Sequence, residues 1–412
     1  MKIDEYYNHY PTVKNINATG LVAITDTNKY LAANTPLPYL ISLVPLKIFN
    51  LRLSIEYLRL VNIIISFITM AIIYFLFIKV NSLYPLEKTL ILFFYPYFLK
   101  TSFTYYMSIF GLLFYFLFLA YYQDGIKNYL ISGLLIAFSI LSQQFYLTLF
   151  FGLILILFLQ SKYDYSTIKN IITFALPTIL LFLPLVYLWK GVVPANYSFH
   201  SVGIDLSKFT AILISIGLVA LPFNFFYLHK VKIKSLINKK HIWLLFAFLI
   251  LSFILSIFFY PAFAEKGGYS KITGLTFHFI NIFDHFNNLS GLFIKLILTF
   301  SGLLNLYHLF SPNGISSERT PFIIELKKIF FEDKLKGILR ISILSFSFGF
   351  VFNVLLAERH LIPLVLSLIF YNLIDLNNPK IIRFLLLVYI IIGSIYFYQY
   401  LFIQQSYLLG NQ

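Results

Sequence analysis

The sequence predicts an all-α polytopic membrane protein, and its composition, span lengths and hydrophobic pattern each favour that class. Of its 412 residues, 59% are hydrophobic and only 11% are charged, which is more apolar surface than a soluble fold can bury. Apolar runs recur from Leu58 to Phe402, and roughly 17 to 25 helical residues suffice to cross about 30 Å of hydrocarbon. These continuous Leu, Ile and Phe runs lack the alternating polarity of barrel strands, so the crossing segments are predicted to be helices.

The apolar segments continue along the whole chain after the first fifty or so residues, and we expect about 11 to 13 transmembrane helices in total. They cover residues 57–78, 89–99, 105–122, 129–142, 145–159, 171–189, 209–228, 242–259, 292–310, 338–356, 361–374 and 384–402. Residues 89–99 and 361–374 are short for a simple crossing, so they suit half-helices or re-entrant elements.

Lysine-rich loops orient these segments in the membrane. The clearest loop, residues 230–240, contains five lysines, and loops of this kind stay in the cytoplasm. Strict alternation of the spans then also places inside the loops that contain Lys79 and Lys88, Lys162 and Lys169, residues 319–336, and Lys380 and Arg383. The net charge of +15 is therefore a topology signal, and we expect membrane lipid, not nucleic acid, to be its partner.

The segments left on the non-cytoplasmic face differ in chemistry from the cytoplasmic loops. They are residues 1–56, the Ser102 region, the Gln143/Gln144 turn and residues 191–207, 261–288 and 358–360. Their reactive side chains are Asp4, Glu5, His9, Asp26, His200, Asp205, Glu265, Lys266, Asp284, His285, Glu358, Arg359 and His360. The inside loops contain mostly lysine with Asn and Ser, so we expect the functional site of this multi-pass protein on the non-cytoplasmic face.

We expect two regions: an external N-terminal segment at residues 1–56 and one transmembrane helical domain at residues 57–412. Between Pro36 and Phe49 the external segment contains an apolar stretch interrupted by prolines, which suits an interfacial or re-entrant element. No basic region followed by an apolar stretch precedes Asp4, so there is no signal-peptide pattern. Either translation begins upstream with a further helix, or the segment crosses together with the first span.

Asp4 and Glu5 are adjacent carboxylates in the external segment, and His9 follows them closely. A carboxylate at this place can act as the general base that removes a proton from an acceptor hydroxyl, and His9 can contact the substrate. The alternative is a solvated, frayed terminus, because acidic residues are common there.

Glu358, Arg359 and His360 lie between two apolar segments with almost no loop. Charges so close to a membrane interior are costly and are usually retained for a function. Arg359 is the best phosphate ligand of the chain, because its planar guanidinium can donate two hydrogen bonds, and His360 can assist it. The alternative is that Glu358 and Arg359 form a pair that caps a helix end at the interface.

The remaining candidates come from longer external loops. Lys266 can bind phosphate, and His200 and Glu265 can bind sugar hydroxyls, although a polar loop would contain such residues in any case. The chain has no cysteine, which excludes disulfides and thiolate metal sites, and its His and carboxylate spacing predicts no metal site. No phosphate-binding loop, dinucleotide fingerprint or nucleophile elbow occurs, and we expect no cofactor.

The ordered motifs resemble the GT-C superfamily of membrane glycosyltransferases, most closely the dolichyl-phosphate-glucose α-1,2-glucosyltransferase family. The family's Asp-Glu followed by His-x-Pro is similar to Asp4-Glu5 and His9-Tyr10-Pro11, and its Leu-Arg-hydrophobic-Val-Asn resembles residues 58–62. Its Thr-Pro stretch, Ser-His motif, Pro-x-x-Leu-Ala-Asp region and Glu-x-Arg-x-x-x-Pro resemble residues 35–36, 198–201, 260–265 and 358–363.

The sequence also departs from the family at several motifs. The family has an opening membrane helix before Asp-Glu, whereas Asp4 is the fourth residue here. A family Thr-Glu is replaced by Tyr105-Tyr106, an Arg-Gln-Thr-Asn by residues 142–145, and Glu358 and Arg359 are adjacent instead of spaced. The resemblance therefore implies the general apparatus of the superfamily and leaves the sugar and the acceptor open.

This resemblance implies a GT-C-like bundle that transfers a hexose, with inversion, from a polyprenyl-phosphate or dolichyl-phosphate donor to a lipid-linked glycan or similar acceptor. In this hypothesis Asp4, with Glu5, supplies the carboxylate that acts as the general base. Arg359, His360 and Lys266 bind the donor phosphate, and Glu358 contacts substrate. Two other classes remain open: a polytopic transporter or lipid or oligosaccharide flippase, and an assembly subunit without chemistry.

Overall fold

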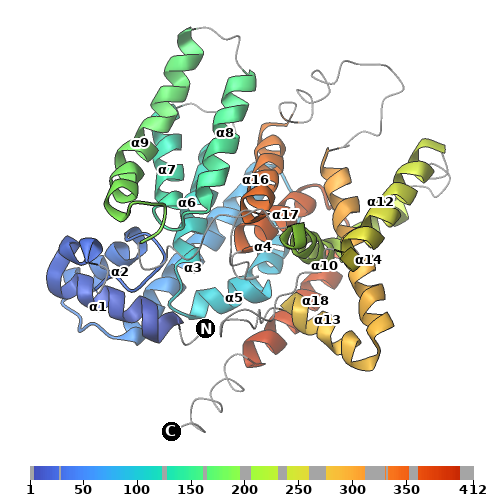
Figure 1. Cartoon of the computed structure of the whole chain (residues 1–412), viewed down its shortest axis with the longest axis horizontal. Coiled ribbons are helices and arrows are strands. Elements are labelled where there is room, and N and C mark those ends of the chain that lie inside the picture. The colour runs from blue at the N-terminus through green and yellow to red at the C-terminus, as the bar shows by residue number, and fades with distance from the viewer. Residues whose placement is uncertain are drawn as a thin grey trace. The chain divides into compact units, whose positions relative to one another are not determined.

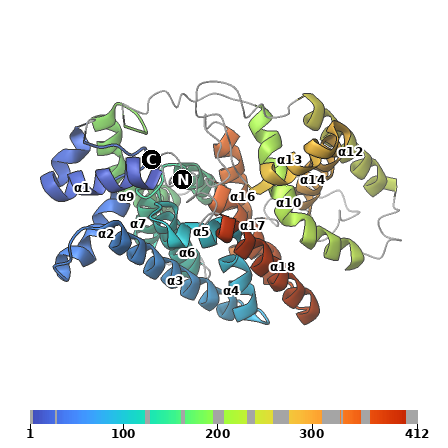
Figure 2. The same ribbon diagram turned by 90° about the horizontal axis from the view of Figure 1, so that it is seen from below.

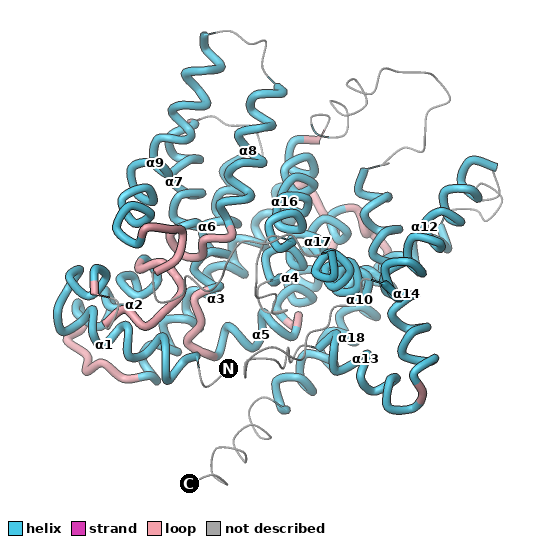
Figure 3. The backbone as a smooth tube through the Cα atoms, in the orientation of Figure 1, coloured by secondary structure: helices cyan, strands magenta, loops and turns pink. Residues whose placement is uncertain are grey.

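A computed structural model describes most of the chain, and the part it describes is all-helical. The described residues are 4–26, 29–122, 128–160, 165–194, 206–230, 239–258, 275–310, 330, 333–351 and 361–399. No strand occurs among them (Figure 3). The predicted all-α class is confirmed for this part of the chain.

The chain forms two compact units: residues 1–201 together with 382–412 form unit 1, and residues 202–381 form unit 2. The helices of unit 1 are η1 (Asp4–His9), α1 (Tyr10–Thr19), η2 (Gly20–Thr25), α2 (Leu37–Ile48), α3 (Ile55–Lys79), α4 (Pro85–Phe93), α5 (Pro96–Phe103), α6 (Ser108–Tyr122), α7 (Tyr129–Ile140), α8 (Tyr146–Gln160), α9 (Tyr165–Trp189) and most of α18 (Pro379–Tyr398). Those of unit 2 are α10 (Leu206–Lys230), α12 (Lys239–Phe258), α13 (Leu275–Phe286), α14 (Asn288–Phe310), α16 (Lys334–Val351) and α17 (Ile362–Ile374).

Each predicted apolar segment overlaps one helix in the described residues, except residues 89–99, which are divided between two. Four of these helices are long and apolar enough to cross a membrane: α3, α9, residues 289–310 of α14, and α18. A fifth span is present if α5 and α6, whose axes are bent by 115°, are counted as one. Several long apolar helices therefore indicate a membrane-embedded protein, while the expected total of about 11 to 13 spans stays a prediction.

Helix α3 shows how the sequence sets these spans. Ser54 is extended and its hydroxyl accepts a hydrogen bond from the Tyr57 backbone N–H at 3.4 Å, which is the usual way to begin a helix. The 25 residues that follow reach about 37 Å, enough to cross the hydrocarbon layer. Helix α3 lies alongside α4, α5 and α6 (Figure 2).

The segment predicted at residues 89–99 is a broken element. Helix α4 ends at Phe93, and Tyr95 is extended (ψ 123°) because Pro96 disfavours helical geometry in the residue before it. A second interruption follows at residues 104–107, where Thr104 is extended (φ −117°, ψ 153°) before α6 begins at Ser108. We call residues 104–107 the helix break. The segment predicted as half-helices or a re-entrant element thus consists of short helices separated by extended residues.

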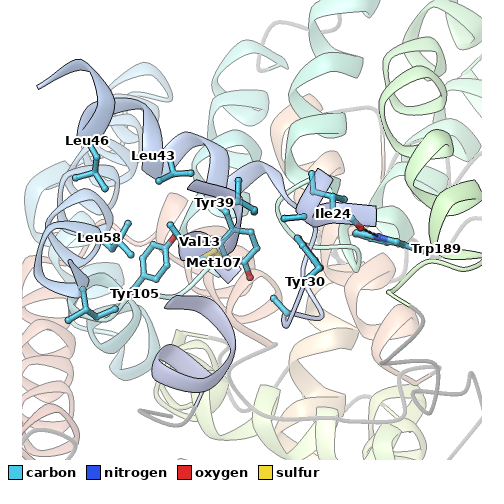
Figure 4. Packing of buried hydrophobic residues seen from close by; sticks show 14 residues of the cluster. Val13, Ile24, Tyr30, Tyr39, Leu43, Leu46, Leu58, Tyr105, Met107 and Trp189 are labelled. Atoms are coloured by element: carbon cyan, nitrogen blue, oxygen red, sulfur yellow. Dashed lines mark hydrogen bonds between the residues drawn. The ribbon is translucent and has the colours of Figure 1, made fainter. Parts of the chain in front are cut away.

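Residues 4–53, which we call the N-terminal layer, pack against the ends of several unit 1 helices. In Figure 1, α7, α8 and α9 stand side by side, with α1 and α2 at one end of them. A buried apolar cluster joins the layer to α3, the helix break and α9 through residues that include Val13, Tyr39, Leu58, Met107 and Trp189 (Figure 4). The interfacial element predicted near Pro36 corresponds to α2, whereas α1 was not expected.

Unit 2 contains one helix where the sequence predicts an external loop. Within residues 261–288, Leu275–Phe286 form α13. The expectation of a loop is wrong for this part, because Ile280 is buried against Ile214 and Leu298. An ion pair of 3.1 Å between Asp284 and Lys295 fastens α13 to α14. Apolar burial and this ion pair together hold α13 as a helix.

Helices α10 and α14 approach each other unusually closely. A Cβ atom on Gly217 would lie 1.8 Å from the Leu298 carbonyl oxygen, and one on Gly302 would lie 2.2 Å from that of Leu213. Only glycine fits at both points, as is common where membrane helices pack through small residues. Near this contact the Asn224 side-chain amide donates to the carbonyl oxygen of Ser301 at 2.8 Å. A buried polar seam therefore runs between the two helices.

Candidate functional site at the N-terminal layer

The structure brings together four segments that the charge pattern places on one side of the membrane. These are the N-terminal layer, the helix break, the Gln143/Gln144 turn and the end of α9. The hydrogen bonds that join the layer to the α7–α9 helices are Gln144 Nε2 to Ala33 O (2.7 Å), Thr35 Oγ1 to Ile140 O (3.4 Å) and Trp189 Nε1 to Ile24 O (3.3 Å). These four segments form one face of unit 1, which we call the layer face.

Glu5 is the central carboxylate of this face. Its two carboxylate oxygens each accept a hydrogen bond of 2.7 Å from the Arg59 guanidinium, in a bidentate pair. One of these oxygens also accepts a hydrogen bond of 2.9 Å from the backbone N–H of Tyr105. The Glu5 side chain is 3% exposed and that of Arg59 is 29% exposed, so the pair is shielded from water on one side only. Bidentate pairs of this kind fix geometry as well as charge.

These contacts give Glu5 a holding role. A carboxylate offers about four lone-pair sites, and three donors already occupy Glu5. A general base needs a lone pair directed at the hydroxyl that it deprotonates. Glu5 is therefore better placed to anchor the first helical turn than to accept a proton.

Asp4 begins η1, directly before Glu5. The placement of its side chain lies outside what the structure describes. Neighbouring residues of a helix project roughly a quarter of a turn apart, so the anchor at Glu5 fixes the backbone from which Asp4 extends. Of the predicted acidic pair, the structure thus assigns contacts to Glu5 and leaves Asp4 as the predicted base.

His9 lies one turn beyond Glu5 and is also buried. Its Nδ1 is 2.8 Å from the Tyr39 hydroxyl of α2, and its ring meets the rings of Tyr105 and Tyr106 edge to face, with centroids 6.5 Å and 5.6 Å away. His9, which is predicted to contact substrate, therefore has neighbours from α2 and from the helix break. His9 and Glu5 therefore both contact Tyr105 of that break.

Asn62 of α3 holds the helix break from the other side. Its side-chain amide donates to the carbonyl oxygens of Thr104 at 2.7 Å and Tyr106 at 2.9 Å, and the residue is fully buried. The break leaves carbonyl groups without helical partners, and Asn62 supplies donors for two of them. Its own Oδ1 has no hydrogen-bond partner among the described residues. Gln143 similarly donates to the Ser108 hydroxyl at 2.8 Å, where α6 begins.

Arg59 and Asn62 were not among the site residues predicted from the sequence. Both lie on the first apolar span, three residues apart and hence on one face of α3. Arg59 and Asn62 could have been identified from the sequence, because a charged and an amide side chain stand three residues apart inside an apolar helix. Polar residues at such places are usually functional or paired.

The remaining predicted site residues lie outside the described residues: Arg359, His360, Lys266, His200, Glu265 and Glu358. Their predicted roles in phosphate and sugar binding stay predictions. Among the residues that the structure does describe, no three His, Cys, Asp or Glu side chains form a group that could hold a metal ion.

Comparisons of the chain with protein-family models, with curated proteins and with solved structures find no match. The arrangement offers an immobilised Glu5–Arg59 pair next to a helix break lined by aromatic and amide side chains, at the end of apolar helices.

Proposed function

We propose that the protein is a membrane-embedded, inverting hexosyltransferase that uses a lipid-phosphate-linked sugar as donor. The observation that carries this proposal is the anchoring of the acidic N-terminal turn on the helix break by Glu5, Arg59 and the Tyr105 N–H. This anchor holds the backbone of Asp4 at a polar face bordered by apolar helices, where a lipid-borne donor and a polar acceptor can meet. The resemblance of the ordered motifs to the GT-C superfamily supports the same chemistry.

In the proposed reaction, the Asp4 carboxylate takes the proton of an acceptor hydroxyl as that oxygen attacks the anomeric carbon of the sugar. The bond between this carbon and the phosphate oxygen breaks, and the lipid monophosphate leaves with the bonding electrons. Arg359, His360 and Lys266 donate hydrogen bonds to the departing phosphate and stabilise its charge. His9, His200, Glu265 and Glu358 contact sugar hydroxyls. The acceptor is a glycan or a lipid-linked glycan.

The experiment that tests this proposal uses the full-length protein in lipid vesicles with a panel of polyprenyl-phosphate hexoses. We expect one donor to be consumed, and D4N to lower kcat by about a hundredfold or more, as general-base removal typically does. The matched control is D26N, because Asp26 lies in the same layer but pairs with Lys29 at 3.2 Å on the exposed side. Full activity of D4N, or equal loss in D26N, would remove Asp4 from the mechanism.

A transporter or flippase is the second candidate, favoured by the seam between α10 and α14. Its Asn224, Ser301 and Asn305 side chains are buried in apolar helices, and Asn305 Nδ2 donates to Asn224 Oδ1 at 3.2 Å. Polar residues of this kind often mark pathways through a membrane. Movement of a labelled lipid-linked sugar across the same vesicles, without its consumption, would support this class and contradict the transferase.

A further inference from the structure

Lys100 of α5 is a buried cation that the proposed reaction has not used. Its residue is only 6% exposed, and its ammonium nitrogen lies 3.4 Å from the Tyr396 hydroxyl of α18. The same ammonium lies 5.3 Å from the centroid of the Tyr396 ring, within cation–π range. A lysine kept among apolar helices is costly, and such residues typically line ligand or ion pathways.

Lys100 is coupled directly to the helix break. The Thr104 hydroxyl donates to the Lys100 carbonyl oxygen at 3.0 Å, and the Thr104 carbonyl oxygen accepts from Asn62. The next residue, Tyr105, donates its N–H to Glu5. Tyr105 comes five positions after Lys100, so their Cα atoms are at most about 18 Å apart. Lys100 therefore belongs to the short helix that leads directly into the helix break.

Helix α18 holds Tyr396 against α5 by close packing. A Cβ atom on Gly393 would lie 2.4 Å from the Phe94 carbonyl oxygen, so only glycine allows this approach. One turn further, the Tyr396 and Tyr97 rings meet with centroids 5.2 Å apart, and Phe397 meets Phe103 at the same centroid distance. Tyr396 is partly exposed whereas Lys100 is buried. The phenol is thus the accessible end of the pair.

We infer that Lys100 and Tyr396 bind the phosphate group of the lipid-linked donor. An ammonium and a phenol hydroxyl both donate hydrogen bonds to phosphate oxygens, and charge-assisted bonds of this kind are short and strong. Their apolar surroundings on α5 and α18 suit a phosphate joined to a hydrocarbon tail. This inference rests on the proposed function, and it adds a binding site within unit 1 to the predicted phosphate ligands.

A second buried lysine provides an internal control. Lys88 of α4 is completely buried, donates to the Ser82 hydroxyl at 2.6 Å and lies 5.9 Å from the Phe77 ring centroid. Ser82 precedes α4, so Lys88 is fixed toward the end of α4 that is remote from the helix break. The two lysines share burial and an aromatic neighbour, but only Lys100 is coupled to the site.

The test measures equilibrium binding of radiolabelled polyprenyl monophosphate to the full-length protein in detergent, without any sugar donor. We expect K100Q to weaken binding about tenfold or more and Y396F to weaken it about threefold or more, while K88Q leaves it unchanged. Polyprenol without phosphate should bind more weakly than the monophosphate, and inorganic phosphate should compete poorly because it lacks the tail.

Thermal unfolding of each variant distinguishes weakened lipid binding from failure to fold. If K100Q does not fold, Y396F decides the question, because it removes one hydroxyl and keeps the ring. Unchanged binding in folded K100Q or Y396F, or an equal loss in K88Q, overturns the inference. If lipid binding depends on Lys100 but no sugar is transferred, the phosphate site is supported and the transferase is contradicted. If sugar is transferred but K100Q binds the lipid as well as wild type does, the transferase is supported and the phosphate site is contradicted.

Discussion

Glu5 and Arg59 lie 54 residues apart in the chain and are joined by two hydrogen bonds of 2.7 Å each. This pair fastens the first helical turn to the first long span, α3. Because Glu5 also accepts the Tyr105 N–H, three separate segments meet at one carboxylate. The pair therefore organises the layer face.

Removing the charge of Glu5 should destabilise this junction. In E5Q the neutral amide cannot accept both guanidinium bonds, and we expect a loss of about 2 kcal/mol in the free energy of unfolding. R59Q should lower the free energy of unfolding by a similar amount. The double variant should lower it by less than the sum of the two single losses, because either single substitution already breaks the pair. Detergent-solubilised protein followed by thermal or denaturant unfolding measures all three values. Strict additivity would show that the pair contributes no coupling energy.

Asn62 should be needed for the shape of the helix break. In N62A the carbonyl oxygens of Thr104 and Tyr106 lose their buried donors, and we expect a loss of about 2 kcal/mol or more in stability. Limited proteolysis should also show faster cleavage near residues 104–107. The control is S66A, since the Ser66 hydroxyl bonds only to the Asn62 carbonyl oxygen within the same helix. Equal stability of N62A and S66A would contradict this role.

The contact between α16 and α17 should weaken at high pH. Partial burial lowers the pKa of Lys336, but the hydrogen bond from its ammonium to Asp375 at 2.6 Å and the charges of Asp375 and Asp333 outweigh this, so the pKa is raised. Because the pKa of Lys336 is higher in the folded protein than in the unfolded chain, its charge stabilises the fold. This stabilisation is complete below the pKa of an unfolded lysine, about 10.4, and is lost as the pH rises through the pKa of Lys336 in the folded protein.

The measurement is the thermal unfolding midpoint between pH 8 and 12 for wild type and D375N. Because Asp375 is well exposed, the stabilisation at neutral pH should amount to no more than about 1 kcal/mol. We expect the wild type to lose this advantage over D375N above roughly pH 10.5. A constant difference between the two proteins across this range would show that Lys336 does not titrate against Asp375.

The sequence predicted the helical elements well and the site only in part. Apolar span length gives α3, α9 and α18 directly, because crossing hydrocarbon requires a minimum number of apolar residues. The short apolar run at residues 89–99 likewise predicted a half-helix or a re-entrant element in place of a simple crossing. Helix α13 was missed because its burial depends on Ile214 and Leu298, which are distant in sequence.

Four of the segments that the charge pattern places on one side of the membrane contact one another in the structure, while the membrane side itself stays a prediction. The charge pattern did not reveal which carboxylate is anchored. Asp4 and Glu5 are equivalent in a sequence pattern, and only the positions of Arg59 and the Tyr105 N–H distinguish Glu5. Tertiary hydrogen bonds of this kind depend on geometry that composition and spacing do not contain.

Unit 1 is built from two stretches of chain that are separated in the sequence by unit 2, residues 202–381. Helix α18 can therefore pack against α5 only after that intervening stretch has been synthesised. At ribosomal speed this synthesis takes on the order of 10 to 40 s. During this interval Lys100 faces its surroundings without the helix that later covers it. Insertion machinery that shelters incomplete membrane bundles should thus affect the yield of this protein more than that of one whose neighbouring helices are consecutive.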